Sequence, residues 1–443
     1  MLEVFIALSV FFSVVCSVML IRIFKRKKYI LVKPSFWFLL FFHVQIQWSS
    51  TIYSIEIFEK LREPYLFFFL TQVLPFLFCI IVQRTYTVVA KKIYARLVKT
   101  NKAITGREYK TLLLIIFILS VVIIGIFLLN TPLTKTGLYQ IVKGSDALVS
   151  TVAREDSLKN APALVRYTYV FFNKVLAIIA VVIITRQLYH LYKQKKWRAV
   201  MGKVLIIFVI ATFSSLSGAR SHGVYVLLSS VITIMFIVSF DVPMLTIALS
   251  AVALLFIPVI IQINKFHGDF SLGNIVFTYN EILLRRSFKV PMQTGLIWVD
   301  YVQKHGFWGV DGFSFLKSFL NDNNYVNVAN FMMNQSSDRL SVDSGLMNTS
   351  FIFSYFSYIG YVAIFLYPIL FLLLDVALYF IRKLSEKLLL PAVILICLSC
   401  INLVNTEYHT IFLSYGYLTG LVFLFIVNKR KAKWDGNIRS IGY

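Results

Sequence analysis

Residues 211–230, ATFSSLSGARSHGVYVLLSS, place a polar cluster inside a long apolar part of the chain. The cluster contains one permanent charge, the guanidinium of Arg220. An arginine at the centre of a membrane helix costs roughly 2.5–3.5 kcal/mol on insertion scales, so it usually marks a functional site or has a partner. Two interpretations follow: Arg220 faces an outward-opening aqueous cavity and binds an anion, or it reaches the membrane interface or a carboxylate on another helix. Gly218 and Gly223 would allow a tight chain reversal beside it.

A second cationic group follows Tyr279, in the sequence YNEILLRRSFKVP. Glu281 and Arg285 are four residues apart and could form an ion pair on one helix face, which leaves Arg286 on a different face. Two adjacent arginines beside a membrane suit a phosphodiester or diphosphate, which a guanidinium binds in bidentate geometry. The alternative is a surface helix whose cations lie on acidic lipid headgroups. Pro291 ends this segment and starts a new helix.

Arg166 is a third candidate cation, near the start of the apolar stretch 164–185. Snorkelling of the side chain to the membrane interface also explains its position. No histidine or carboxylate pair has the spacing of a metal site, and the sequence contains neither HExxH nor the phosphate-binding GxxxxGK[ST]. We therefore expect no metal, nucleotide or other cofactor.

Membrane helices must position these residues. The chain has 443 residues, of which 58% are hydrophobic and 14% charged, whereas soluble domains have about 45–50% apolar and about 25% charged residues. Apolar stretches of about 20 residues, enough to cross a bilayer, recur along the chain. The sequence thus predicts an all-α polytopic membrane protein.

We expect about eleven transmembrane helices, at residues 3–24, 30–54, 64–83, 111–129, 164–185, 204–217, 224–240, 244–263, 355–381, 388–405 and 410–428. Five segments between them hold 26 of the 44 lysines and arginines: 24–28, 84–110, 186–203, 382–387 and 429–439. This distribution follows the positive-inside rule and explains the formal charge of +24 without nucleic-acid binding. It predicts an outside N-terminus and a cytoplasmic C-terminus in the cytoplasmic membrane.

Three regions follow from this topology. Residues 1–263 form an N-terminal bundle of about eight spans with a first outer loop at 130–163. Residues 264–350 form a large extracytoplasmic loop, whose many aromatic residues predict short helices that fold onto the membrane part, with a helix–turn–helix at 315–332. Residues 351–443 hold the last spans and a basic cytoplasmic tail. No internal repeat relates the two halves, whereas transporters built from inverted repeats show such symmetry.

Short sequences in this layout resemble the Wzy-type oligosaccharide repeat-unit polymerases of O-antigen, capsule and exopolysaccharide assembly. They are SLSGARSHGVYVLL, EILLRRSFKVP followed by an aromatic helix, and MNTSFIFSYFSYIGYVAIFLYPIL, which leads into a span after the large outer loop. The resemblance covers most of the chain as layout and short motifs. It implies a fold like that of the GT-C-like lipid-linked glycosyltransferases.

The resemblance also implies a reaction. A glycan on undecaprenyl diphosphate is transferred to the non-reducing end of an incoming lipid-linked repeat unit, and undecaprenyl diphosphate leaves. Arginines stabilise the leaving diphosphate, and the matching cations are Arg220, Arg285, Arg286 and Arg166. The implied partners are the lipid-linked donor and acceptor, the lipid bilayer, a chain-length regulator and a flippase.

A general base must take the proton of the attacking hydroxyl. The resemblance leaves it unassigned, and the candidates are His305, Asp311, Asp343 and Glu281. The related O-antigen ligases carry a histidine about eleven residues before a glycine at the start of the span after the large loop. Here the matching position is Thr349, counted back from Gly360, which disfavours a ligase. Two alternatives stay open: a ligase-like transferase, and a flippase or other transporter that binds a diphosphate lipid.

Overall fold

The computed structural model describes residues 1–103, 109–144, 161–218, 220–238, 288–313, 328–335 and 348–440, with isolated positions at 149, 152–153, 156–157, 271, 273 and 285. All regular secondary structure within these residues is helical. Eight helices in the described part of the chain are long and apolar enough to cross a membrane. The protein is thus an α-helical polytopic membrane protein, as the composition predicts.

The described chain divides into two compact units, and each combines segments from both sides of the predicted large loop. Unit 1 contains Met1–Val88, Phe270–Val376 and Cys400–Ile411, and unit 2 contains Val89–Asp269, Ala377–Ser399 and Phe412–Tyr443. The positions of the two units relative to one another are not determined.

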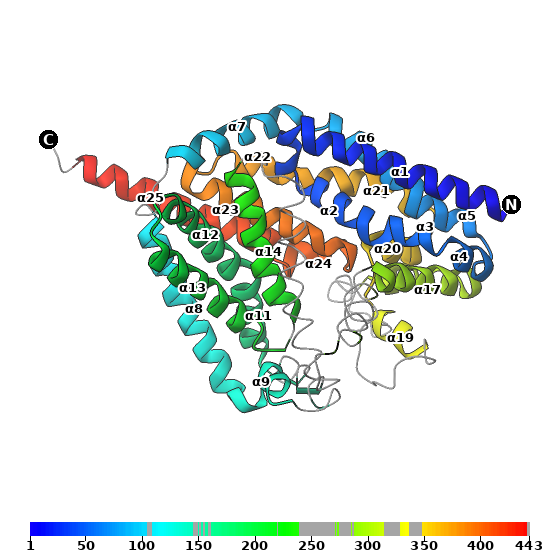
Figure 1. Cartoon of the computed structure of the whole chain (residues 1–443). Helices are drawn as coiled ribbons and strands as arrows, with labels where there is room; N and C mark the ends of the chain where they lie inside the picture. Colours follow the sequence, from blue (N-terminus) through cyan, green and yellow to red (C-terminus); the bar gives the residue numbers. More distant parts are fainter. Residues whose placement is uncertain are drawn as a thin grey trace. The chain divides into compact units, whose positions relative to one another are not determined.

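Unit 1 is built on α1, α6, α17 and α20, with α1 beside α6 and α17 beside α20 (Figure 1). Its helices are α1 Leu2–Arg26, α2 Pro34–Phe42, α3 Trp48–Ile52, α4 Ser54–Lys60, α5 Pro64–Phe68, α6 Leu74–Arg84, α17 Val290–His305, α19 Val328–Gln335, α20 Phe351–Ile359 and α21 Val362–Leu373. Two π-helical turns, His43–Gln47 and Phe69–Val73, join α2 to α3 and α5 to α6. Short 3₁₀ turns include Gly309–Gly312 and Asn402–Val404.

A network of polar side chains holds the first helices of unit 1 together. Gln72 Nε2 donates to Ser50 Oγ at 2.8 Å and to Thr51 Oγ1 at 3.0 Å. Ser13 Oγ donates to Gln72 Oε1 at 3.0 Å, and Gln47 Nε2 donates to the same oxygen at 3.1 Å. Small polar residues allow close helix packing in membranes, and their hydrogen bonds have no water to compete with.

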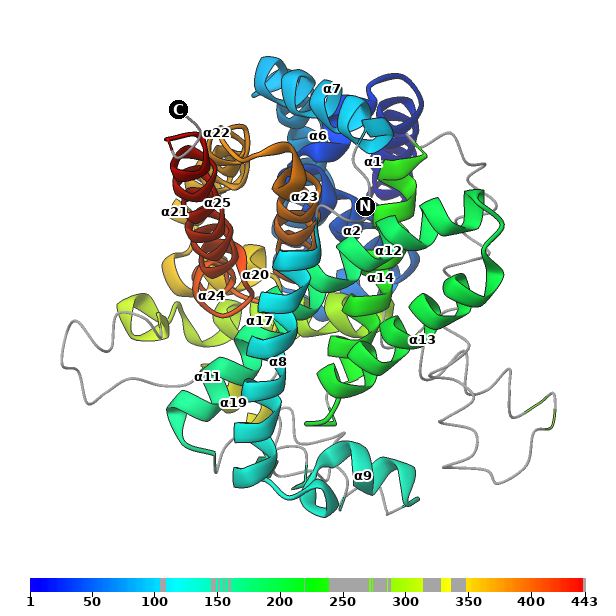
Figure 2. The same ribbon diagram turned by 90° about the vertical axis from the view of Figure 1, so that its left-hand side faces the viewer.

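Unit 2 is a bundle in which α12, α13 and α14 pack against one another (Figure 2). Its helices are α7 Thr87–Ala103, α8 Lys110–Asn130, α9 Gly137–Val142, α11 Ala163–Phe171, α12 Ala177–Lys193, α13 Trp197–Ser214, α14 Arg220–Ile237, α22 Ala377–Ile381, α23 Glu386–Ile401 and α25 Tyr417–Ser440. A π-helical turn, Phe172–Leu176, makes α11 and α12 one continuous rod. α24, Tyr408–Leu413, begins in unit 1 and ends in unit 2.

Burial distinguishes the central rod of unit 2 from its lipid-facing helix. The apolar window of Ala163–Lys193 is 83% buried, whereas that of Lys110–Asn130 is 22% buried. α8 exposes large apolar side chains such as Phe117 and Val121, as a helix in contact with lipid should. The α11–α12 rod therefore carries its polar residues inside protein.

Four of the eleven predicted spans differ from the eight apolar helices or cannot be compared with them. The predicted span 224–240 is not among the eight, because its apolar helix, His222–Ile237, is shorter. The predicted span 30–54 is helical from Pro34 to Ile52, but it is not among the eight apolar helices because its middle carries the polar sequence HVQIQ. The predicted span 355–381 is interrupted at Gly360, because α20 ends at Ile359 and α21 begins at Val362. The span 244–263 lies outside the described residues.

Candidate functional site

The most unusual charge in unit 2 is Lys174, in the π-helical turn of the α11–α12 rod. The residue is only 6% exposed. Its Nζ lies 4.7 Å from the ring centroid of Tyr225 on α14 and 4.6 Å from that of Tyr415, which precedes α25. Insertion of one residue into a helix produces a π-helical turn, and such turns often occur at functional sites. The turn presents an ammonium group between two tyrosine rings.

Gly416 allows the chain to approach this lysine closely. It has φ +87°, and a Cβ at this position would lie 2.8 Å from the carbonyl oxygen of Lys174. Only glycine fits both conditions without strain. The hydroxyl of Ser399 lies 2.8 Å from the carbonyl oxygen of Tyr415 and fixes the neighbouring backbone. Tyr415 is thereby held over the ammonium.

Within the residues that the structure describes, Lys174 has no carboxylate partner and its Nζ forms no hydrogen bond. A cation–π contact contributes about 0.5–2 kcal/mol, whereas removing an ion from water costs several kcal/mol. Two aromatic rings therefore stabilise this charge only in part. An intramembrane lysine without a counter-ion is by default a functional residue.

His222 and Asn173 extend the polar group around Lys174. Asn173 Nδ2 lies 3.3 Å from Nδ1 of His222, which connects the rod to α14. Three buried polar atoms of this region have no hydrogen-bond partner among the described residues: Asn173 Oδ1, Ser214 Oγ and Ser217 Oγ. Buried polar atoms are rarely left unpaired, so such a group at one place indicates a site that binds a polar ligand or water.

Arg220 begins α14, two residues before His222. The backbone of this position is described, and the side chain lies outside the described residues. The reversal predicted from the two glycines is confirmed: Gly218 has φ +84°, and a Cβ on Gly223 would lie 3.2 Å from the carbonyl oxygen of Ala211 on α13. α13 and α14 therefore pack closely where α13 ends and α14 begins, and Arg220 is the first residue of α14.

Tyr169 ties this reversal to the α11–α12 rod. Its hydroxyl oxygen lies 3.0 Å from the carbonyl oxygen of Phe213 and 3.1 Å from that of Ser214, and it accepts from the backbone N–H of Ser217 at 3.3 Å. Arg220 and Lys174 thus belong to elements that are directly connected within unit 2. We call Lys174, Asn173, His222 and the start of α14 the cationic site.

Two of the other three predicted cations are described. Arg166 is half-buried on α11, eight residues before Lys174, and its guanidinium lies 5.2 Å from the ring centroid of Tyr167. Arg285 is exposed in unit 1. Arg286, the other member of the predicted arginine pair, lies outside the described residues.

Two of the four predicted base candidates are described, and both are exposed in unit 1. His305 is the last residue of α17, and its ring lies 4.5 Å from that of Tyr301. Asp311 lies in the 3₁₀ turn Gly309–Gly312. Asp343 and Glu281 lie outside the described residues.

Unit 1 contains a hydrogen-bonded group of ionisable side chains that is not among the predicted site residues. His409 Nε2 lies 3.0 Å from Glu407 Oε2, and the hydroxyl of Tyr358 donates to Glu407 Oε1. The hydroxyl of Tyr355 lies 3.5 Å from His409 Nδ1. We call these four residues the Glu–His group.

A sequence signal for both groups existed. Lys174 is the one charged residue between Arg166 and Arg186, and Glu407 and His409 are the one acidic residue and the one histidine between Lys387 and Lys429. Charged residues that interrupt apolar segments, as Arg220 does, are candidates for a functional site.

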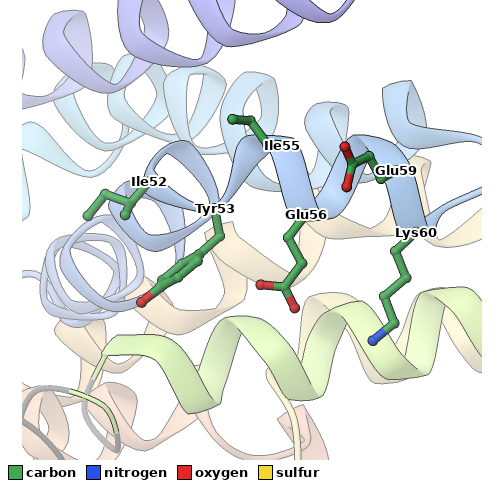
Figure 3. Close-up of a pocket in the computed structure, with 6 residues that line it drawn as sticks. All are labelled: Ile52, Tyr53, Ile55, Glu56, Glu59 and Lys60. Atoms are coloured by element: carbon green, nitrogen blue, oxygen red, sulfur yellow. The ribbon is translucent and has the colours of Figure 1, made fainter.

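A depression in unit 1 is not suited to an anion. It is lined by Ile52, Tyr53, Ile55, Glu56, Glu59 and Lys60. Figure 3 shows Tyr53, Glu56 and Lys60 on one side of the segment and Ile55 on the other. Two carboxylates in so small a lining repel a diphosphate. This depression is not a candidate for the anion.

No cluster of three or more histidine, cysteine or carboxylate side chains suited to a metal ion occurs in the described part of the chain. Comparison with protein-family models, with curated proteins and with solved structures finds no match to this chain.

Proposed function

We propose that the protein is a lipid-linked glycosyltransferase of the polymerase type, which joins undecaprenyl-diphosphate-linked oligosaccharide repeat units at the outer side of the cytoplasmic membrane. The observation that carries the proposal is Lys174, a buried ammonium with two aromatic neighbours and no counter-ion within the described residues. Burial of such a charge destabilises a membrane protein. An anion that enters the membrane region on its own lipid would offset this desolvation cost.

The cationic site fits a diphosphate for a further reason. Arg220 stands on the same helix as His222, which contacts the residue next to Lys174. A guanidinium and an ammonium together offer a planar pair of donors and a point charge. Both features suit a group with several anionic oxygens that must be held in one orientation.

In the proposed reaction, the acceptor hydroxyl attacks the anomeric carbon of the donor glycan. The bond from that carbon to the diphosphate oxygen breaks, and the diphosphate leaves with the electron pair. Negative charge grows on the leaving group in the transition state. Cations fixed in a poorly hydrated site stabilise that charge more than water does, because they need no reorganisation.

Substitution of the cations tests the proposal in cells that make the polysaccharide. Removal of one donor aimed at a developing charge lowers the rate about 10²–10³-fold. We expect Lys174→Met and Arg220→Ala to abolish polymer and to leave single repeat units on the outer face. Arg220→Lys should retain a small residual activity, because it keeps the charge but loses the planar fork. Lys203→Met, at a half-buried position on α13 of the same unit, is the matched control.

The location of the intermediate separates this proposal from its alternatives. Loss of a flippase leaves repeat units on the cytoplasmic face, whereas loss of a ligase leaves finished polymer on its lipid. Normal polymer length and amount from both Lys174→Met and Arg220→Ala would overturn the proposal.

A further inference from the structure

We infer that Arg186, Thr100 and His190 bind a phosphate group near the C-terminal end of α12. The inference goes beyond the proposed function and does not depend on it, and all three residues belong to unit 2. Arg186 lies twelve residues after Lys174 on the same helical rod. A helix rises 1.5 Å per residue, so the two positions are roughly 18 Å apart along the rod. The phosphate site is therefore distinct from the cationic site.

Arg186 is a buried cation without a counter-ion. It is 2% exposed. Its Nη1 donates to the hydroxyl of Tyr109 at 2.7 Å, and its Nη2 donates to the carbonyl oxygen of Thr100. No carboxylate pairs with the guanidinium within the described residues. Neutral acceptors replace only part of the water that a buried charge loses, so this cation remains available to an anion.

Three buried polar atoms at this place have no hydrogen-bond partner among the described residues: Arg186 Nε, Thr100 Oγ1 and His190 Nε2. The backbone of Thr100 is bound directly to Arg186. His190 follows Arg186 by four residues in α12, so the two side chains lie on the same helix face. Buried polar atoms are rarely left unpaired, and three of them on connected residues indicate a ligand or ordered water.

The chemistry of these atoms favours an oxyanion over water. A guanidinium binds phosphate through two parallel N–H groups, and Nε–H is a donor for which the described fold provides no acceptor. A threonine hydroxyl and an imidazole N–H can donate as well. Phosphate has enough acceptor oxygens for all three groups. It also neutralises the buried charge of Arg186, which a water molecule cannot do.

The surrounding charge is positive. α7 and α12 contain no aspartate or glutamate. On α7, Lys92 and Lys99 are exposed, whereas Thr100 lies on the buried side. Four exposed cations follow at the end of α12 and the start of α13: Lys193, Lys195, Lys196 and Arg198. A surface with charge of one sign concentrates ions of the opposite sign, so anions are drawn to this end of unit 2.

Aromatic residues mark the same end as a membrane interface. Tyr192 and Trp197 are 53% and 58% exposed, and their ring centroids lie 5.4 Å apart. Tyrosine and tryptophan are enriched where a membrane meets water, and basic pockets between membrane helices at this level bind the phosphate groups of lipid headgroups. The ligand is thus the phosphate of an anionic phospholipid or inorganic phosphate from solution, which offer the same oxygens.

The test uses the purified full-length protein in phosphatidylcholine nanodiscs, with the unfolding temperature as the readout. One arm adds inorganic phosphate, with chloride at equal ionic strength as the control. The other arm replaces part of the phosphatidylcholine by phosphatidylglycerol. A ligand that binds the folded protein raises the unfolding temperature. Both arms are repeated in Lys174→Met, so that binding at the cationic site is not counted.

Thr100→Val is the decisive variant. It keeps the shape of the side chain and the carbonyl group that holds Arg186, and it removes only a hydroxyl that has no partner among the described residues. Without ligand, it should therefore be at least as stable as the wild type, whereas the phosphate group should bind about 10–100-fold more weakly. Thr212→Val is the matched control, because that hydroxyl donates to the carbonyl oxygen of Phe208 on its own helix. It should bind as the wild type does.

Arg186→Lys tests the guanidinium. It keeps the charge and loses the planar fork, so we expect a similar loss of binding. Lys193→Met removes an exposed cation at the same end and should change binding little. If Arg186→Lys does not fold, His190→Phe takes its place, because it removes another of the three unpaired atoms.

Stabilisation in the phosphatidylglycerol arm alone would identify the ligand as a lipid headgroup, and stabilisation by inorganic phosphate alone would identify a soluble anion. The inference is wrong if neither arm stabilises the wild type, since the three atoms would then bind only water. It is also wrong if Thr100→Val and Arg186→Lys bind as tightly as the wild type, or if Lys174→Met abolishes all binding. None of these results bears on polymer formation, so the proposed function is tested separately.

Discussion

Two buried lysines, one in each unit, have different neighbours: one has a carboxylate and carbonyl oxygens, the other has aromatic rings. Lys33 of unit 1 is fully buried and lies 4.0 Å from Asp375. It donates to the carbonyl oxygen of Val82 at 2.7 Å and to that of Thr85. Lys174 of unit 2 is nearly as buried, but its described neighbours are the rings of Tyr225 and Tyr415.

The pair at Lys33 also serves the local backbone. Asp375 accepts from the N–H of Ser35 at 3.1 Å and from its hydroxyl at 2.8 Å. Ser35 is in the first turn of α2, which begins at Pro34, so the carboxylate satisfies an N–H that has no partner within the helix. Every strong polar atom of this pair has a partner in the fold.

The contrast shows why burial alone does not identify a site. A buried charge with a counter-ion and carbonyl acceptors stabilises the fold. A buried charge that the fold does not neutralise is available to a ligand. Arg186, twelve residues after Lys174 in unit 2, is intermediate between the two. Its guanidinium donates to the hydroxyl of Tyr109 at 2.7 Å and to the carbonyl oxygen of Thr100, whereas its Nε has no hydrogen-bond partner among the described residues.

Lys33→Met should have the largest effect on stability. It leaves the carboxylate of Asp375 buried without its cation, and removal of one partner from a buried ion pair costs about 3–5 kcal/mol. We expect the unfolding temperature of the detergent-solubilised protein to fall sharply. Lys33→Met combined with Asp375→Leu should recover most of the loss. A single variant as stable as the wild type would show that Lys33 and Asp375 are not an ion pair in the folded protein.

Gly416→Ala should have an intermediate effect, confined to the cationic site. The added Cβ meets the carbonyl oxygen of Lys174, and the positive φ adds strain. We expect a loss of about 1–3 kcal/mol, in the range of overpacked positions, and weaker binding of undecaprenyl diphosphate as Tyr415 moves. Gly202→Ala is the control, because a Cβ there meets nothing within 4 Å. If Gly416→Ala and Gly202→Ala bind undecaprenyl diphosphate equally well, the backbone next to Tyr415 does not contribute to binding of the diphosphate.

The helical membrane class and most spans could be predicted from the sequence, because apolar stretches and basic clusters depend only on composition. The interruption at Gly360 could not, since residues on both sides are apolar. Arg220 was recognised as an anomaly in an apolar segment, and the reversal at Gly218 and Gly223 is confirmed. The Glu–His group was missed because Tyr355 and Tyr358 stand about fifty residues before Glu407 and His409, and only the fold joins them.

The Lys174→Met variant tests the central claim most directly, in one experiment with two readouts. The unfolding temperature of the purified protein is measured alone and with undecaprenyl diphosphate, with undecaprenol as the uncharged control. We predict that Lys174→Met is at least as stable as the wild type, because an uncompensated buried charge is removed, and that undecaprenyl diphosphate no longer stabilises it. A variant that unfolds as easily as Lys33→Met, or that keeps the full stabilisation by undecaprenyl diphosphate, would contradict the account.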